Sequence, residues 1–265
     1  MSASAPAVEQ QIEVNGASLF VEEHGQGDPI MLVHAGLLSS GSWAGLVPLL
    51  AESFRVITFD NRGHGRSTNP SGALSFEQLA DDTAALIEVL ELERPFVGGW
   101  SDGGEVALQF GLRHPGRARA LVAGGTSLEL GSEATKSKMR AIFHVDDDGV
   151  VDLDAVASEF EQTLLPMLRH SHPRGEQHWR TIVQQSLTMW LSYSGLTREQ
   201  VERITEPVLV VVGDRDEYVP VEEALRLYRW LPQAELAILP GTSHLRPIMD
   251  PATLARSLTD FLRRH

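Results

Sequence analysis

The segment 99–103 constrains this chain more than any other, because it places one serine between glycines at a change of pattern. It reads Gly-Trp-Ser-Asp-Gly and lies between a short strand-like run at 94–98 and a helical pattern at 104–114. The flanking glycines let the backbone turn sharply where a Cβ would collide. We therefore predict a strand, a tight turn and a helix, with the Ser101 hydroxyl exposed at the positive end of the helix dipole. A strand that feeds directly into a helix is typical of α/β architecture.

Candidate partners for this serine follow two later strand-like runs. The apolar, β-branched run 207–212 is typical of a strand buried on both faces of a parallel sheet, and Asp214 and Asp216 come soon after it. The run 236–239 leads into His244. Because the carboxyl ends of parallel strands meet at one edge of a sheet, these side chains should lie near the serine. The order serine, acid, histidine is the one that this type of turn uses.

Each of these residues has an ordinary explanation when it is considered alone. A Gly-x-Ser-x-Gly segment occurs by chance in glycine-rich chains, an aspartate often caps a turn or a helix, and loop histidines are common. Their joint occurrence at strand ends favours a catalytic triad of Ser101, His244 and one of the two aspartates.

Four parts of the chain carry a family pattern. They are the loop 34–43 after a strand-like run, the turn 60–67, the serine turn 99–103, and the pair of segments 213–216 and 241–244. Together they resemble the α/β-hydrolase fold family, in its cap-bearing branch of esterases, lactonases and cofactor-free haloperoxidase-like enzymes. The resemblance covers nearly the whole chain outside the long segment before the run at 207.

The resemblance implies the α/β-hydrolase fold, with a mostly parallel sheet of about eight strands, helices on both faces and an inserted helical cap. The family's acid usually falls at the last residue of Gly-x-x-Asp, which favours Asp216 and leaves Asp214 as the alternative. About eighty residues without a strand-like run precede residue 207, far more than an ordinary crossover needs. We therefore predict a core of residues 1–127 and 206–265 and a helical cap at 128–205.

The loop that begins at His34 resembles the family's His-Gly oxyanion loop. In the family, two backbone N–H groups bind the oxyanion, and the resemblance assigns them here to Asp102 and Gly36, with Leu37 as the second choice for the latter. Ala35 stands where the family has glycine, so the backbone of the loop is expected to turn differently. His34 is expected to support this loop through its ring nitrogens.

Three tryptophans are candidates for the substrate pocket. Trp43 and Trp100 neighbour the catalytic loops, and Trp190 belongs to the apolar content of the predicted cap. Packing explains Trp100 equally well, and most apolar residues of the predicted cap are expected to pack it onto the core. The Asp102 side chain also has two explanations, since it either caps the following helix or meets a cationic group of the substrate.

Local patterns predict three further features. Asn15-Gly16 between two alternating runs indicates a two-residue hairpin, which would give the sheet an antiparallel start. Ser75 with Gln78 three residues later indicates a helix that begins with a capping box. Asp250 is expected to be the N-cap of the last helix, with Pro251 at its first position.

Composition limits the partners. The formal net charge of −14 argues against nucleic-acid binding, which needs a basic surface. The chain has no cysteine, its histidines lack ligand spacing, and neither a basic, apolar start nor a bilayer-length apolar run is present. We expect a cytoplasmic monomer or homodimer that acts on a small molecule, with no metal, cofactor, nucleic acid or membrane as partner.

The predicted function is hydrolysis of a small-molecule carboxylic ester or lactone by Ser101, His244 and Asp216 through an acyl-enzyme. One alternative keeps the fold and changes the chemistry to C–C bond hydrolysis, perhydrolysis or a biosynthetic cyclase or lyase step. The other is a ligand receptor without catalysis on the same scaffold.

Overall fold

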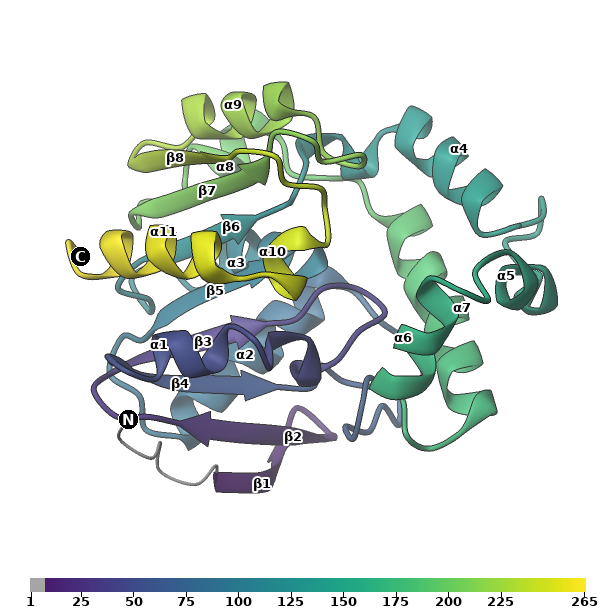
Figure 1. The fold of residues 1–265 in the computed structure, drawn as a ribbon, viewed down its shortest axis with the longest axis horizontal. Helices are drawn as coiled ribbons and strands as arrows, with labels where there is room; N and C mark the ends of the chain where they lie inside the picture. Colours follow the sequence, from purple (N-terminus) through teal and green to yellow (C-terminus); the bar gives the residue numbers. More distant parts are fainter. Residues whose placement is uncertain (1–7) are drawn as a thin grey trace.

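A single sheet forms the centre of the molecule in this computed structural model, which describes residues 8–265 (Figure 1). Its strands are β1 (Val8–Val14), β2 (Ala17–His24), β3 (Asp28–Val33), β4 (Phe54–Phe59), β5 (Phe96–Trp100), β6 (Leu121–Gly124), β7 (Val208–Gly213) and β8 (Ala234–Leu239). They lie in the order β1-β2-β4-β3-β5-β6-β7-β8. The pairs β1–β2 and β2–β4 are antiparallel and the others are parallel. The predicted mostly parallel sheet is confirmed.

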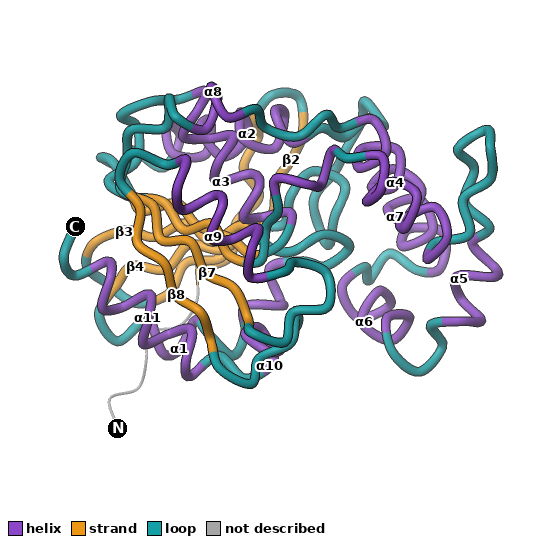
Figure 2. Tube along the Cα trace, turned by 90° about the horizontal axis from the view of Figure 1, so that it is seen from above, coloured by secondary structure: helices purple, strands orange, loops and turns teal. Residues whose placement is uncertain are grey.

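Helices cover both faces of this sheet (Figures 1 and 2). They are α1 (Val47–Leu50), α2 (Phe76–Val89), α3 (Asp102–Arg113), α8 (Arg198–Val201), α9 (Val221–Trp230), α10 (Arg246–Met249) and α11 (Ala252–Leu262). Buried side chains of α1 and α11 pack on one face, with Leu50 and Phe261 among them. Those of α2, α3 and α9 pack on the other, with Phe76, Val106 and Leu227 among them. The parallel strands β5, β6 and β7 are therefore buried on both faces, as their apolar sequences predict, whereas the edge strand β8 is partly exposed.

The chain between β6 and β7 is helical. It holds η2 (Leu128–Gly131), α4 (Glu133–Ile142), α5 (Leu153–Glu159), α6 (Leu164–Ser171), α7 (Glu176–Ser192) and α8. Within the described residues, strand pairing in this stretch is limited to an isolated bridge between Val145 and Val151. Figure 1 shows α4–α7 at the end of the sheet toward which the parallel strands point, whereas α8 contacts α3 and α9. The division into a core and a cap at residues 128 and 205 stays a prediction.

The predicted hairpin is confirmed, and the predicted capping box forms in part. Asn15 and Gly16 join β1 to β2 with φ values of 46° and 76°, and positive φ at both positions is what a type I′ hairpin turn requires. At the start of α2, the Gln78 N–H donates to Ser75 Oγ at 3.1 Å. The serine thereby satisfies one of the free donors of the first helical turn. The Gln78 side chain, however, donates to Asp82 Oδ1 at 3.0 Å and does not complete the capping box.

The predicted cap of the last helix is wrong. Pro251, not Asp250, is the N-cap residue of α11, which begins at Ala252. Asp250 instead ends the short helix α10, where its carboxylate pairs with the Arg246 guanidinium at 2.8 Å. The sequence pattern did not reveal α10. Because Asp250 is the C-cap of this helix, it is not available as the N-cap of α11.

Candidate active site

Ser101 lies on a strained turn between β5 and α3. Its φ of 56° and ψ of −117° belong to a region that residues with a Cβ rarely adopt. The turn is held by the Ser101 N–H, which donates to the Gly124 carbonyl at 2.8 Å. A Cβ on Gly103 would lie 2.1 Å from the Val33 carbonyl oxygen, so no side chain fits there. The sequence thus folds locally into the tight strand-to-helix turn that its glycines predict.

The structure brings Asp216 and His244 together. Asp216 Oδ2 lies 2.8 Å from His244 Nδ1, and both side chains are buried. The other oxygen, Oδ1, accepts hydrogen bonds from the N–H groups of Tyr218 (2.9 Å) and Val219 (2.8 Å). With the carboxylate accepting from Nδ1–H, the Nε2 atom of the imidazole carries a free lone pair. Such a histidine is prepared to accept a proton.

Asp214 faces a different partner. Its Oδ1 accepts the Thr242 N–H at 3.1 Å, and its side chain is about one third exposed. Asp214 therefore stabilises the loop that leads to His244, whereas Asp216 contacts the imidazole itself. His244 is further held by its own N–H, which donates to Glu217 Oε2 at 3.0 Å.

Trp100 connects the histidine loop to the serine turn. The Trp100 Nε1–H donates to the His244 carbonyl at 2.9 Å, and the two ring centroids are 6.2 Å apart. Since Trp100 directly precedes Ser101, this bond ties the histidine loop to the turn that carries the serine. Trp100 and Trp43 are both buried in the cluster on the α1 and α11 face. A contact of either residue with substrate stays a prediction.

The predicted oxyanion loop forms a tight turn beside Asp102. The Leu38 N–H donates to the Ala35 carbonyl at 3.2 Å, and Leu37 has a φ of 62°. A Cβ on Gly36 would lie only 2.4 Å from Asp102 Oδ2. The two residues that the resemblance assigns as oxyanion donors are thus neighbours in space. Ala35, the departure from the family pattern, is accommodated as a buried residue of the turn.

His34 supports this loop through both of its ring nitrogens. Its Nδ1 lies 2.8 Å from the Ala35 carbonyl, and the Asn61 N–H donates to its Nε2 at 3.0 Å. Both ring nitrogens are therefore used within the protein, which leaves the imidazole no free atom for catalysis. The predicted supporting role of His34 agrees with these contacts.

Asp102 is linked to the helices between β6 and β7. The Trp190 Nε1–H, on α7, donates to Asp102 Oδ2 at 2.8 Å. Burial raises the pKa of the Asp102 carboxyl to about 7, although the Trp190 hydrogen bond and the nearby His244 imidazole oppose this shift. Trp190, a pocket candidate from the sequence, thus contacts the residue next to Ser101.

The family can now be assigned. A model of the alpha/beta hydrolase family matches residues 30–257. This chain belongs to the alpha/beta hydrolase family. It is accordingly an enzyme of the hydrolase class, as the sequence resemblance implies.

The known proteins similar to this hydrolase differ in what they act on. 2-Hydroxymuconate semialdehyde hydrolase of Pseudomonas sp. (strain CF600) is 24% identical, over 98% of this chain and 95% of its own. Pimeloyl-[acyl-carrier protein] methyl ester esterase of Nitrosomonas europaea is 27% identical, over 86% of this chain and 93% of its own. The solved structure of a thermophilic esterase from Thermogutta terrifontis superposes with a TM-score of 0.78 at 25% identity, over 98% of this chain and 99% of that one.

The part of the hydrolase that the structure describes shows neither a metal set nor a spanning helix. Among residues 8–265, no three His, Asp or Glu side chains are arranged to hold a metal ion. None of the helices described is long and apolar enough to cross a membrane.

A buried carboxyl that the sequence did not single out lies one turn along α3. Glu105 accepts hydrogen bonds from the Tyr193 hydroxyl and from Thr126 Oγ1, the latter at 3.1 Å. Gln109 Nε2–H donates to the same Tyr193 oxygen at 2.8 Å. Burial raises the pKa of Glu105 to about 7, against the opposing effect of the Tyr193 and Thr126 hydrogen bonds. The available signal was a glutamate one turn into the helix that follows Ser101.

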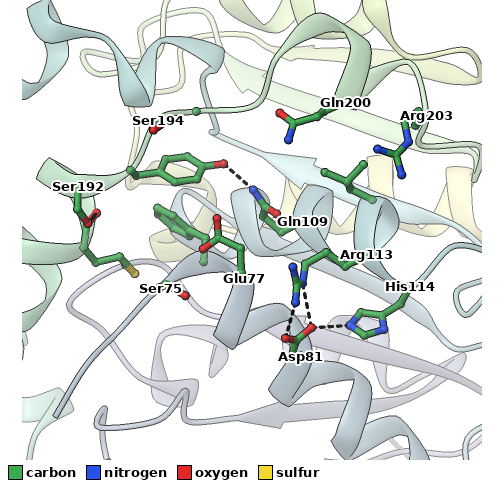
Figure 3. Close-up of a pocket in the computed structure, with 15 residues that line it drawn as sticks. Ser75, Glu77, Asp81, Gln109, Arg113, His114, Ser192, Ser194, Gln200 and Arg203 are labelled. Atoms are coloured by element: carbon green, nitrogen blue, oxygen red, sulfur yellow. Dashed lines mark hydrogen bonds and ion pairs between the residues drawn. The ribbon is translucent and has the colours of Figure 1, made fainter. Parts of the chain in front are cut away.

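A surface cavity of about 690 Å³ borders this network (Figure 3). Gln109 and Tyr193 line it, and Asp81 forms ion pairs there with Arg113 and His114. None of the three predicted catalytic residues lines this cavity. The cavity therefore lies outside the candidate active site and is lined in part by two residues of the Glu105 network.

We expect Glu105→Gln to stabilise the hydrolase at pH 8 and to have little effect at pH 4. The pKa of the carboxyl is near 4.5 when it is exposed and about 7 in the folded protein. Between pH 4.5 and pH 7, the folded state therefore retains a proton that the unfolded state has lost. The free energy of unfolding then falls by about 1.4 kcal/mol per pH unit across this window, or by about 3 kcal/mol in total. Glutamine removes this loss because it stays neutral.

Urea unfolding at pH 4, 6 and 8 measures the effect. Glu161→Gln is the control, because Glu161 is exposed. An equal change in the free energy of unfolding at all three pH values would contradict the prediction.

Proposed function

We propose that this hydrolase cleaves a small-molecule carboxylic ester or lactone through a covalent acyl-enzyme. The observation that carries the proposal is the 2.8 Å contact between Asp216 and His244, on a loop bonded to the residue before Ser101. A strained turn that carries a serine, joined by a hydrogen bond to a loop that carries an oriented imidazole, supports activation of the hydroxyl for acyl transfer.

In the proposed reaction, Ser101 Oγ attacks the substrate carbonyl while His244 Nε2 takes its proton. Asp216 holds the imidazole in the Nδ1–H tautomer and stabilises its cationic form. The N–H groups of Asp102 and Gly36 bind the developing oxyanion, and each contributes about 3 kcal/mol if it behaves like an oxyanion donor elsewhere. His244 then donates the proton to the leaving alkoxide, which departs as an alcohol.

The second half of the reaction releases the acid. His244 takes a proton from a water molecule as the water oxygen attacks the acyl carbonyl. The tetrahedral intermediate collapses, the bond to Ser101 Oγ breaks, and His244 returns the proton to the serine. In a lactone, the leaving alcohol remains attached to the acyl group, so the product is one hydroxy acid.

A fluorophosphonate probe and two substrate classes test the proposal. The probe forms a bond between Ser101 Oγ and phosphorus and releases fluoride, and it requires an activated serine. We expect stoichiometric labelling together with hydrolysis of short-chain nitrophenyl esters or of small lactones.

The two other outcomes are informative in different ways. An unlabelled wild-type protein would contradict an activated serine and favour a ligand receptor. A labelled protein that hydrolyses neither esters nor lactones would overturn the substrate class and favour C–C bond hydrolysis, one of the alternatives left open by the sequence.

A further inference from the structure

Four histidines meet where the link between α6 and α7 crosses two loops of the core. His34 and His64 follow β3 and β4, whereas His172 follows α6 and His178 lies in the first turn of α7. The ring centroids are 5.0 Å apart for His34–His64, 5.9 Å for His64–His172 and 5.0 Å for His172–His178. Within the described residues these rings are not arranged to hold a metal ion. Their roles are therefore inferred from their hydrogen bonds.

His172 uses both of its ring nitrogens on core loops. Its Nε2 lies 3.0 Å from the Leu37 carbonyl, and the Gly65 N–H points at its Nδ1 at 3.1 Å. The two contacts are satisfied together only by the neutral tautomer with the proton on Nε2. Burial lowers the pKa of His172 to about 4, which keeps the ring neutral above that pH. His172 is therefore a fixed donor to Leu37.

Two peptide groups link the Leu37 carbonyl, which His172 contacts, to the Gly36 N–H. The Leu37 carbonyl and the Leu38 N–H belong to one peptide group, and this N–H donates to the Ala35 carbonyl at 3.2 Å. The Ala35 carbonyl and the Gly36 N–H belong to a second peptide group, which joins Ala35 to Gly36. In a trans peptide the N–H points opposite to the C=O, so fixing the Ala35 oxygen fixes the direction of the Gly36 N–H. The chain of contacts thus runs from His172 to the proposed oxyanion donor.

His34 also holds the Ala35 carbonyl of this turn, at 2.8 Å, whereas His172 is the partner of the Leu37 carbonyl. Leu37 is buried, so its carbonyl would have no solvent partner if the imidazole were removed, and buried acceptors without a partner are costly. Leu37 also has a positive φ, which a residue with a Cβ leaves readily once its contacts are lost. The turn would then relax and rotate the peptide groups that precede it.

We propose that His172 is a positioning residue that holds the Gly36 oxyanion donor in place through Leu37, Leu38 and Ala35. This inference rests on the proposed function. It makes the segment between α6 and α7 part of the catalytic geometry, although His172 itself touches no reacting atom.

Two substitutions separate the bonds of His172. Asparagine can still accept from Gly65 but is too short to reach Leu37, whereas glutamine can still donate to Leu37. We expect His172→Asn to lower kcat for ester hydrolysis about 10–100-fold, with KM changed less than about twofold. This loss is smaller than that from removing an oxyanion donor altogether, because the Gly36 N–H is misplaced but still present. His172→Gln should stay within about threefold of the wild-type kcat.

His178→Asn is the matched control. His178 Nε2 lies 2.7 Å from the Gly63 carbonyl, so this histidine also joins α7 to a core loop, but it does not contact the oxyanion loop. A purely structural role of these histidines predicts equal losses for both asparagine variants, together with parallel drops in Tm. His172→Phe, which keeps the ring volume and removes both bonds, repeats the test if the asparagine variant does not fold.

The rate of labelling by the fluorophosphonate gives a second measure that needs no substrate, since the phosphonyl oxygen also occupies the oxyanion site. We expect the labelling rate to fall with kcat in His172→Asn and to be retained in His172→Gln. Equal losses at positions 172 and 178, or a raised KM with kcat unchanged, would overturn the positioning role. A labelled wild type without esterase activity would overturn only the proposed substrate class, whereas an unlabelled wild type would overturn both proposals.

Discussion

Ser101→Ala is expected to lower kcat for ester hydrolysis by roughly a millionfold, the loss seen when a serine nucleophile is removed elsewhere. The methyl group cannot form the acyl-enzyme, so His244 and Asp216 have no hydroxyl to act on. The fold should be unaffected, because alanine meets the same positive φ as the serine and fills less space. Single-turnover and steady-state kinetics on a nitrophenyl ester measure the effect.

Ser243→Ala is the control for this substitution. Ser243 directly precedes His244, so a general disturbance of the histidine loop would appear in this variant too. It should keep both turnover and labelling close to wild type. An Ser101→Ala protein with normal turnover would remove Ser101 from its proposed role.

Asp216→Asn is expected to lower kcat by about 10⁴-fold, the loss seen when a triad aspartate becomes an amide. Asp216 Oδ1 accepts from the N–H groups of Tyr218 and Val219, so an asparagine must keep its oxygen on that side. Its NH₂ group then faces His244 Nδ1 and donates to it. The imidazole is forced to carry its proton on Nε2, and it can no longer accept the proton of the serine.

Asp214→Asn provides the contrast, because the amide oxygen can still accept the Thr242 N–H. This variant should retain kcat within a few-fold and lose mainly stability. Kinetics of both variants, with Tm measured alongside, decide between the two aspartates. A larger loss of kcat at position 214 than at 216 would reverse the assignment.

Much of the fold and of the candidate site follows from local sequence patterns. Buried parallel strands are uniformly apolar, and the run 207–212 therefore indicates β7 without knowledge of its neighbours. Close backbone contacts, such as that of Gly103 with the Val33 carbonyl, leave no room for a Cβ at the glycines around Ser101. The local sequence is therefore enough to predict this turn. The choice of Asp216 needed the family resemblance, because spacing alone leaves Asp214 equally placed.

Other parts of the site depend on contacts that no local pattern records. His172 meets Leu37 across 135 residues of chain, and each of them is an ordinary residue in its own segment. Glu105 and Tyr193 meet across 88 residues, where burial rather than sequence spacing creates the network. The error at Asp250 has a similar cause, since a four-residue helix is too short to show a period.

The bond between Trp100 and His244 has a consequence for the growing polypeptide on the ribosome. Its two residues are 144 positions apart, so the turn bearing Ser101 is synthesised well before His244, the proposed general base. At roughly 5–20 residues per second, this delay is on the order of ten seconds. Under the proposed mechanism, a nascent chain in which the Ser101 turn has already formed would thus remain inert toward esters until the later strands have docked.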